Sequence, residues 1–377
     1  MIQPQSCSAH KKITQTVKNI TRRSFIAKPL AAGLALSASV KAPYVFARKP
    51  IKLRILGTHV TLQEELRQQA MKDLGFEITF EPKGSAAVLQ KASMAPETFD
   101  LYEQWSNSIN VLWSSGSIKP IQKERITHWS EINPLTKTGR ITPQANLGAG
   151  DAPYKILHVQ DDDTLGPKTT SKVSFLPYVH NVDSFGYNTN VIPEGEAYKT
   201  ESWAWLLDDE YRGKVGVVNA PSIGVFDMAL AAQAKGLMTF NDIGNISRSE
   251  LDTLFALLDE KKQKGHFNGF WTSVPESVEF MKTGRVVIES MFSPAVSSLN
   301  GQNIPVTYAA PKEGYRGWHG VMCLSSTTSG YQEDAAYDYM NWWLSGWPWR
   351  GVASTGSPPR SRRRTRPSGP SFRTRKE

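Results

Sequence analysis

The sequence is short of cysteine, and this limits how the fold can be stabilised. Among 377 residues there are two cysteines, Cys7 and Cys323. Cys7 falls in an N-terminal stretch that we predict to be removed, which leaves one cysteine and no possible intrachain disulfide. A chain of this length can bury a full hydrophobic core, and its size favours two domains or lobes.

Motifs that mark common enzyme and metal sites are also missing. There is no Gly-x-Ser-x-Gly elbow, no Gly-x-x-x-x-Gly-Lys phosphate loop and no Cys/His pair at metal-binding spacing. The acidic run 161–166 fails as a calcium loop, because Leu165 stands where an oxygen ligand is needed. We therefore predict no catalytic residue, cofactor or metal, although a periplasmic enzyme on a two-lobed scaffold stays open as an alternative.

The net charge of +9 does not describe the body of the chain. Residues 1–47 hold seven Lys/Arg and no acid, and residues 348–377 hold nine Lys/Arg and one acid. The segment 48–347 therefore has 28 basic and 34 acidic residues. Nucleic-acid binding needs clustered positive charge to displace counterions, so this acidic body argues against a nucleic-acid partner.

The N-terminus has the three parts of an export signal. A basic region ends in Arg22-Arg23, a weakly apolar stretch runs over 29–40, and Val45-Phe46-Ala47 leaves small residues at the usual processing positions. The arginine pair followed by Phe25 and Ile26 resembles a twin-arginine signal. The apolar stretch is shorter than the roughly 20 residues that span a bilayer. We predict cleavage near Ala47 and a mature protein free in the periplasm.

The C-terminal residues 348–377 differ from everything before them. They lack hydrophobic periodicity and have the Pro, Arg, Ser and Gly bias of disordered chain. One interpretation is a basic arm for nucleic acid or anionic lipid. We favour a change of reading frame after about Trp347, which replaced a natural C-terminus.

The pattern of strands and helices along the body predicts an α/β fold. Short apolar strands alternate with helices, which is typical of a largely parallel sheet covered on both faces. Expected strands lie at 51–56, 77–81, 99–103, 215–218, 286–291, 304–309 and 320–324. Expected helices lie at 61–73, 84–94, 223–235, 249–264 and 274–282, with a Trp-rich helix ending near 347. Capping boxes are predicted at Thr61/Glu64 and Ser273/Glu276.

The segment 175–235 carries the most organised pattern. It begins with extended chain that Pro177, Asn181 and Gly186 should interrupt with turns. Ser202 is placed to cap a short helix that Gly213 ends. The buried strand 215–218 then leads through a polar loop into a helix. Such strand-to-helix loops line the ligand crevice of open α/β sheets.

The ordered series of residues in this segment resembles one family. FGYNTN at 185–190, SWAWLLDDEYRGKVGVVNAP at 202–221 and FDMALAAQAKG at 226–236 are similar to extracellular solute-binding proteins of ABC importers. The resemblance is to the branch that includes spermidine/putrescine-binding proteins, and it covers about 51–347. It implies a two-lobed periplasmic binding fold, type 2-like, with a ligand cleft between the lobes and multiple crossovers.

The resemblance also implies a division of the chain and a set of partners. We expect lobe 1 at 48–175 plus 288–310 and lobe 2 at 176–287 plus 311–347. The partners would be a small polar solute and the permease subunits of an ABC importer. We expect a monomer that does not span the membrane.

Candidate ligand-binding residues are polar and aromatic side chains at the expected strand ends. They are Thr58, His59, Trp105, Asn107, Tyr178, His180, Asp183, Asn219, Ser222, Gly224, Trp271 and Ser293. Gln104, Ser273, Ser290 and Phe292 are weaker candidates at the same ends.

The loop 219–224 bears on the solute. The resemblance implies that polyamine-binding relatives place carboxylates there, but the first acid in this chain is Asp227, one turn inside the helix. Free N–H groups at a helix start suit a carboxylate, a sulfonate or a neutral oxygen. Glu103 and Asp183 could still hold one amine, so a zwitterion is compatible. We predict that spermidine and putrescine are not the natural solutes; a polyamine-binding protein with a relocated amine site is the alternative.

Overall fold

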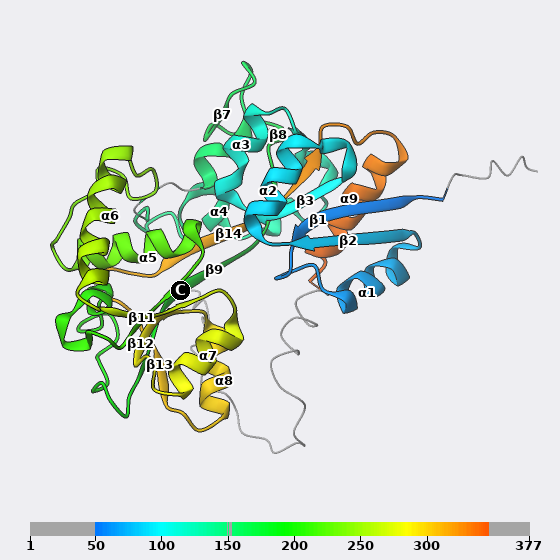
Figure 1. Cartoon of the computed structure of the whole chain (residues 1–377). Coiled ribbons are helices and arrows are strands. Elements are labelled where there is room, and N and C mark those ends of the chain that lie inside the picture. Colours follow the sequence, from blue (N-terminus) through cyan, green and yellow to red (C-terminus); the bar gives the residue numbers. More distant parts are fainter. Residues whose placement is uncertain (1–49, 149, 151–152, 347–377) are drawn as a thin grey trace, which may run out of the picture. The chain divides into compact units, whose positions relative to one another are not determined.

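The computed structural model describes residues 50–148, 150 and 153–346 (Figure 1). The predicted signal peptide 1–47 and the predicted tail 348–377 lie outside these residues, so both stay predictions. The described part is a mixed α/β structure, as the sequence pattern predicts.

Strands and helices alternate through most of the described chain. The strands are β1 (Lys52–Thr58), β2 (Glu77–Lys83), β3 (Leu101–Trp105), β4 (Ile118–Lys119), β5 (Ile121–Gln122), β6 (His158–Val159), β7 (Leu165–Gly166), β8 (Lys172–Val173), β9 (Leu176–Asn188), β10 (Val215–Val218), β11 (Phe267–Trp271), β12 (Ile288–Met291), β13 (Val306–Tyr308) and β14 (Arg316–Ser325). The helices are α1 (Glu64–Leu74), α2 (Ser85–Met94), α3 (Ile109–Ser114), α4 (Pro134–Thr138), α5 (Pro221–Ala234), α6 (Arg248–Gln263), α7 (Val274–Lys282), α8 (Ser293–Gly301) and α9 (Tyr331–Leu344).

The main sheet has the strand order β11-β10-β12-β9-β14-β3-β1-β2. β1 pairs in parallel with β2 and β3, and β10 pairs in parallel with β11 and β12. The two parallel groups are joined by β9 and β14, which pair with each other and with their outer neighbours in antiparallel fashion. Figure 1 shows β9 and β14 running side by side. A small antiparallel sheet, β5-β8-β6-β7, is separate.

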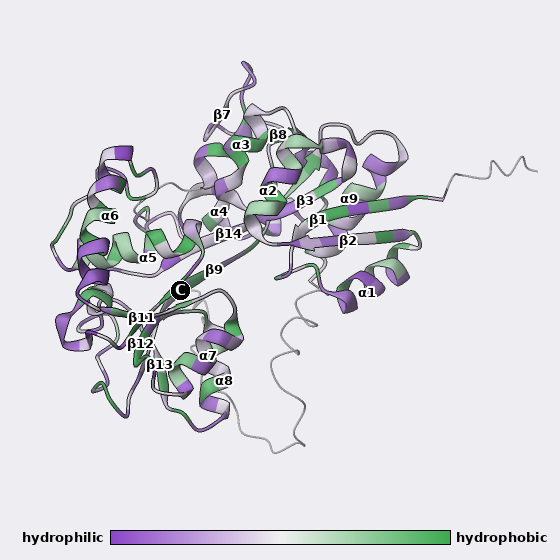
Figure 2. Ribbon diagram, in the orientation of Figure 1, coloured by the Kyte–Doolittle hydropathy of each residue, from purple (hydrophilic) through white to green (hydrophobic). Residues whose placement is uncertain are grey.

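Buried side chains fall into two groups that define two lobes. The first-lobe core gathers residues of β1 to β3, the start of β9, the end of β14 and α9. The second-lobe core gathers the end of β9, β10, α5 and β12, and a neighbouring cluster adds α7, α8 and β13. Figure 2 shows the hydrophobic and hydrophilic residues that alternate along β1, which belongs to the first-lobe core.

The predicted division of the later segments between the lobes is wrong. Ile288 and Ala309 belong, with Phe185, to the second-lobe core, although 288–310 was expected in lobe 1. Conversely, Met322 and Trp343 pack in the first-lobe core, although 311–347 was expected in lobe 2. The reason is strand pairing: β12 pairs with β10 and with the second half of β9, whereas β14 returns along β9 to β3.

Some of the helix caps and turns predicted from the sequence are confirmed, and others are wrong. Ser273 and Glu276 form the predicted capping box of α7, and the Ser202 hydroxyl caps a 3₁₀ helix at Trp203–Leu207. No capping box forms at Thr61; α1 starts three residues later, after Gln63. The expected turns in 176–188 are absent, because pairing with β14, β12 and β13 keeps β9 extended throughout.

No helix within the described ranges has both the length and the apolar character needed to cross a bilayer.

Gly224 lets α5 approach β10 closely. A Cβ at this position would lie 2.3 Å from the carbonyl oxygen of Val218. Because backbone atoms on both sides are fixed by helix and sheet hydrogen bonds, the clash can be relieved only by moving α5 off the strand.

We therefore expect Gly224→Ala to lower the free energy of unfolding by about 1–3 kcal/mol, the usual cost of overpacking. Gly301→Ala is the matched control: Gly301 ends α8 and nothing lies within 4 Å of its added Cβ. That variant should unfold within about 0.5 kcal/mol of the wild type. Urea denaturation followed by circular dichroism measures both, and equal midpoints for the two variants would contradict the packing role.

Candidate functional site

The paired strands β9 and β14 present different side chains on their two faces. Arg316 lies opposite Asp183, Trp318 opposite Asn181 and His319 opposite His180. Since neighbouring residues of a strand point to opposite faces, two sets result. We call Asp183, Asn181, Arg316 and Trp318 the Trp318 face, and His180 and His319 the His319 face.

The Trp318 face reaches the end of β3 in the first lobe. The rings of Trp105 and Trp318 meet edge to face with centroids 4.9 Å apart. The Trp105 indole N–H also donates to the Ser85 hydroxyl at the start of α2, at 3.3 Å. Trp105 is partly exposed, so this pair offers an aromatic surface beside polar groups, the combination found in sites for small polar solutes.

An ion-pair cluster from three elements lies on the same face. Arg316 Nη2 is 2.7 Å from Asp183 Oδ2, and Arg316 Nε is 2.6 Å from Asp227 Oδ1 on α5. Burial raises the pKa of Asp227 to about 6 against the opposing effect of Arg316, and it raises the pKa of Asp183 as well. Whether Asp183 holds a ligand amine stays a prediction, and in this structure its carboxylate is already bonded to Arg316.

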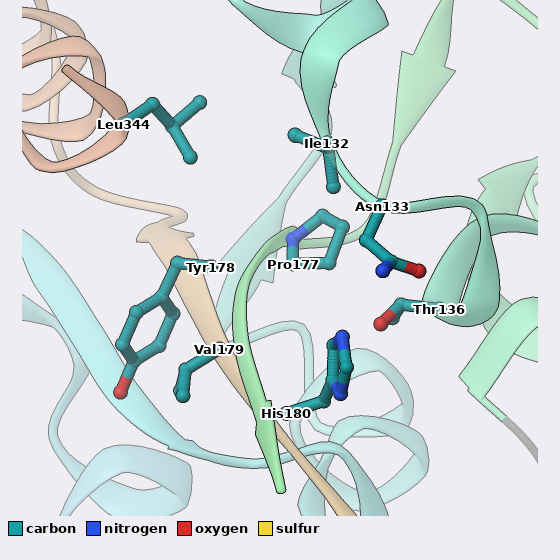
Figure 3. A pocket seen from close by; sticks show the side chains of 8 residues that line it. All are labelled: Ile132, Asn133, Thr136, Pro177, Tyr178, Val179, His180 and Leu344. Carbon is teal, nitrogen blue, oxygen red and sulfur yellow. The ribbon is translucent and has the colours of Figure 1, made fainter. Parts of the chain in front are cut away.

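On the His319 face, His180 lines a cavity of about 210 Å³ (Figure 3). The residues around it are Ile132, Asn133, Thr136, Pro177, Tyr178, Val179, His180 and Leu344. Figure 3 shows His180 and Thr136 pointing into the same hollow. Because they are three positions apart along β9, His180 and Asp183 point to opposite faces and do not share one site.

Tyr178 and Glu103 form a buried polar contact in the first lobe. The Tyr178 hydroxyl donates to Glu103 Oε1 at 2.7 Å and lies 3.2 Å from Thr61 Oγ1. Glu103 Oε2 has no hydrogen-bond partner among the described residues. Burial raises the pKa of Glu103 to about 8, so this carboxyl is mostly protonated at neutral pH and is a poor partner for an ammonium group.

The remaining first-lobe candidates lie at strand ends with different exposure. Thr58 is buried at the end of β1, where its carbonyl accepts a hydrogen bond from Leu62 N–H. His59 and Asn107 are exposed in the loops that follow β1 and β3. β1 and β3 are adjacent parallel strands, so these loops lie at the same edge of the sheet.

In the second lobe, the loop after β10 has fewer free backbone N–H donors than the sequence pattern predicts. Asn219 and Ser222 are exposed, but α5 begins with Pro221, which has no N–H. The N–H groups of Ile223 and Gly224 both donate to the Ala220 carbonyl. Gly224 is buried and has the packing role described above, so the predicted anion site at this helix start is weaker than the sequence pattern suggests.

Trp271 is a buried side chain of the second lobe. It is 1% exposed, its indole N–H donates to the Ser290 carbonyl at 3.0 Å, and its ring meets Phe292 edge to face. The Asn219 N–H donates to the Trp271 carbonyl, which ties the ends of β10 and β11 together. Ser293 is exposed at the first residue of α8.

The sequence missed Arg316, Trp318 and His319, which complete both faces. Only 320–324 was expected as a strand there, whereas β14 begins at Arg316. Alternating large side chains at 316 and 318 are the signal that could have extended it. Within 50–148, 150 and 153–346, no group of three or more His, Cys, Asp or Glu side chains could hold a metal ion.

The protonated state of Glu103 makes stability depend on pH. In the unfolded chain a glutamate has a pKa of about 4.3, whereas the buried group has a pKa of about 8. The unfolded state therefore binds fewer protons between these values. The stabilisation that protonated Glu103 contributes is present below pH 4 and is lost as the pH rises to 8.

The free energy of unfolding of Glu103→Gln should therefore fall less than that of the wild type between pH 5 and 8. Chemical denaturation across that range tests this, with the exposed Glu65→Gln on α1 as control; parallel curves for wild type and Glu103→Gln would contradict it.

Comparisons with known proteins agree with this architecture. A profile of the bacterial extracellular solute-binding protein family matches residues 65–346. The spermidine/putrescine ABC transporter substrate-binding protein PotD of Streptococcus pneumoniae is similar in structure, with a TM-score of 0.55, 18% identity and coverage of 81% of each chain. The Tp0655 (TpPotD) lipoprotein of Treponema pallidum has a TM-score of 0.59, 13% identity and coverage of 81% of this chain and 83% of its own.

The Atu4243–GABA receptor is similar to a comparable degree, with a TM-score of 0.56, 14% identity and coverage of 81% of both chains. At these identities the likeness shows the fold, and it confirms the predicted two-lobed α/β architecture. A search of curated protein sequences gives no match. Because the family profile spans about three quarters of its length, the chain belongs to the bacterial extracellular solute-binding proteins.

Proposed function

We propose that this protein is the solute-binding component of an ABC importer, which captures a small polar solute and delivers it unchanged to the permease subunits. The observation that carries the proposal is the β9–β14 pair, which joins two separately packed lobes and places aromatic and polar side chains on one face. Family membership and the importer proteins among its structural neighbours support it.

The solute is proposed to bind against the Trp318 face. Trp105 from the first lobe and Asp227 from the second both contact this face, so a solute there could touch both lobes. Two joining strands with few other covalent links allow hinge closure around a ligand.

Export to the periplasm completes the proposal. The family is named as extracellular, which supports removal of the leader 1–47 near Ala47. The twin-arginine route and the monomeric state are further parts of the proposal, and they rest on the sequence alone.

Binding should be accompanied by closure and depend on the aromatic pair. The full chain is screened by thermal shift against separate pools of amino acids, organic acids, sugars and polyamines, and hits are measured by calorimetry and small-angle scattering. We expect a smaller radius of gyration with the bound solute and at least 10-fold weaker binding for Trp105→Ala and Trp318→Ala. Phe255→Ala removes an exposed aromatic ring on α6 and should bind as the wild type does.

Product analysis of the same mixtures separates this proposal from its alternative. Recovery of the solute unchanged after long incubation is expected of a binding protein. Turnover of a pool component without measurable closure would instead favour an enzyme on the two-lobed scaffold.

The solute is proposed to carry at most one ammonium group. Asp183 and Asp227 share one cation, Arg316, which offsets only one of their two negative charges, and Glu103 carries a raised pKa, so these three carboxyls do not supply the two or more charges that a polyamine needs. A buried ammonium without a charged partner costs several kcal/mol, against roughly 8.2 kcal/mol for micromolar affinity. The neighbours' names include both polyamines and GABA, so the fold does not choose the solute.

Spermidine and putrescine should therefore bind weakly or not at all. Calorimetric titration of the full chain with each polyamine at neutral pH is expected to give no saturable heat below about millimolar concentration, where the binding free energy is only about 4 kcal/mol. Submicromolar binding of either polyamine would overturn the solute class while leaving the importer role intact.

A further inference from the structure

Two histidines face each other on the joining strands. His180 of β9 and His319 of β14 are direct register partners, and their ring centroids lie 5.9 Å apart. The pair lies on the face opposite Trp318, and His180 is exposed at the cavity of Figure 3. It is therefore separate from the proposed solute site.

A hydrogen bond holds the His319 ring in place through Nδ1 and leaves its Nε2 for a ligand. The Thr136 hydroxyl of α4 lies 2.8 Å from Nδ1 of His319, which leaves Nε2 of that ring facing away from this bond. Burial lowers the pKa of His319 to about 4 and lowers that of His180, so both imidazoles are neutral at pH 7. Neutral imidazole is the form that binds metal ions, and a hydrogen bond at the other ring nitrogen fixes its orientation.

The spacing suits two nitrogens on one metal ion. With metal–nitrogen bonds of about 2.0–2.1 Å, two imidazoles on one ion have ring centres roughly 5 Å apart. The exposed His180 ring can rotate to close the remaining gap. The cavity of about 210 Å³ beside it has room for several waters, each of which occupies about 30 Å³, to complete the coordination.

We propose that His180 and His319 bind one divalent transition-metal ion, such as Cu²⁺ or Zn²⁺, through two imidazole nitrogens with water in the other positions. Imidazole favours these ions over Ca²⁺ and Mg²⁺, which need oxygen ligands. The described part of the chain contains no third His, Cys, Asp or Glu that would complete a larger group. The site is thus open, and its affinity is modest compared with a structural zinc site.

Such an ion would act on the joining strands themselves. It would link β9 to β14 where the two strands run between the lobes, and Thr136 ties the same place to α4. An ion bound there would restrain the twist of the two strands, since both ligand side chains must keep one relative orientation.

The test uses the full chain with Zn²⁺ and Cu²⁺ as probes at pH 7.5, without added solute. Competition with a chromophoric chelator gives the Zn²⁺ affinity. We expect His180→Ala and His319→Ala each to weaken binding at least 10-fold. His128→Ala is the matched control, since His128 is a partly exposed histidine next to Glu131 on a separate turn, and it should bind as the wild type does.

Spectroscopy identifies the ligands independently of affinity. Electron paramagnetic resonance of the Cu²⁺ complex should show splitting from two nitrogens in the wild type and from one in His180→Ala. His180 is exposed, so this variant should fold normally, and circular dichroism checks this. Unchanged affinity and spectrum in the His180→Ala/His319→Ala double variant, or absence of saturable binding by the wild type, would overturn the proposal.

Discussion

The antiparallel pairing of β9 with β14 is the constraint on which the rest of the structure depends. These two strands carry the only strand-to-strand hydrogen bonds between the two parallel groups in the described part of the chain. The start of β9 and the end of β14 pack in the first-lobe core, and the end of β9 packs in the second-lobe core. The side chains in the middle of the two strands belong to neither core. The candidate residues Asp183, Trp318 and His180 lie in that middle stretch.

Strand alternation places two different sets of side chains on one short ladder. On one face Arg316, Asp183 and Trp318 combine charge with an aromatic surface, and on the other His180, the register partner of His319, lines a cavity. A buried arginine between two carboxylates is expensive to form but more expensive to break, since removing one partner of a buried pair costs about 3–5 kcal/mol. The cluster therefore fixes α5 against β9 and β14, and Arg316 offsets one of the two negative charges that a ligand amine could use.

Each lobe contains a buried glutamate whose pKa is raised by burial. Glu103 in the first lobe and Glu289 in the second are both fully buried, and burial raises the pKa of each to about 8. Each accepts a hydrogen bond from a hydroxyl, Tyr178 or Ser277, and each has a second oxygen without a partner among the described residues. Such groups are tolerated because protonation removes the charge, so the contribution of these two carboxyls to stability is larger under mildly acidic conditions.

The sequence by itself determined the type of most helices and strands, the resemblance to the family and several of the residues that lie at strand ends. Val215–Val218 and Val274–Lys282 were predicted at their observed bounds, because apolar runs and capping residues act within a few positions of one another. The predicted residues Trp105, His180 and Asp183 do lie on or against the joining strands.

Only the tertiary structure decided which lobe receives β12 and β14, and which face each site residue occupies. Strand pairing joins residues more than 100 positions apart, as in Arg316 with Asp183, and no local pattern encodes that choice. For the same reason the pairing of Asp227 with Arg316, the packing role of Gly224 and the meeting of His180 with His319 could not be predicted from the sequence: each depends on a neighbour that long-range folding brings into contact.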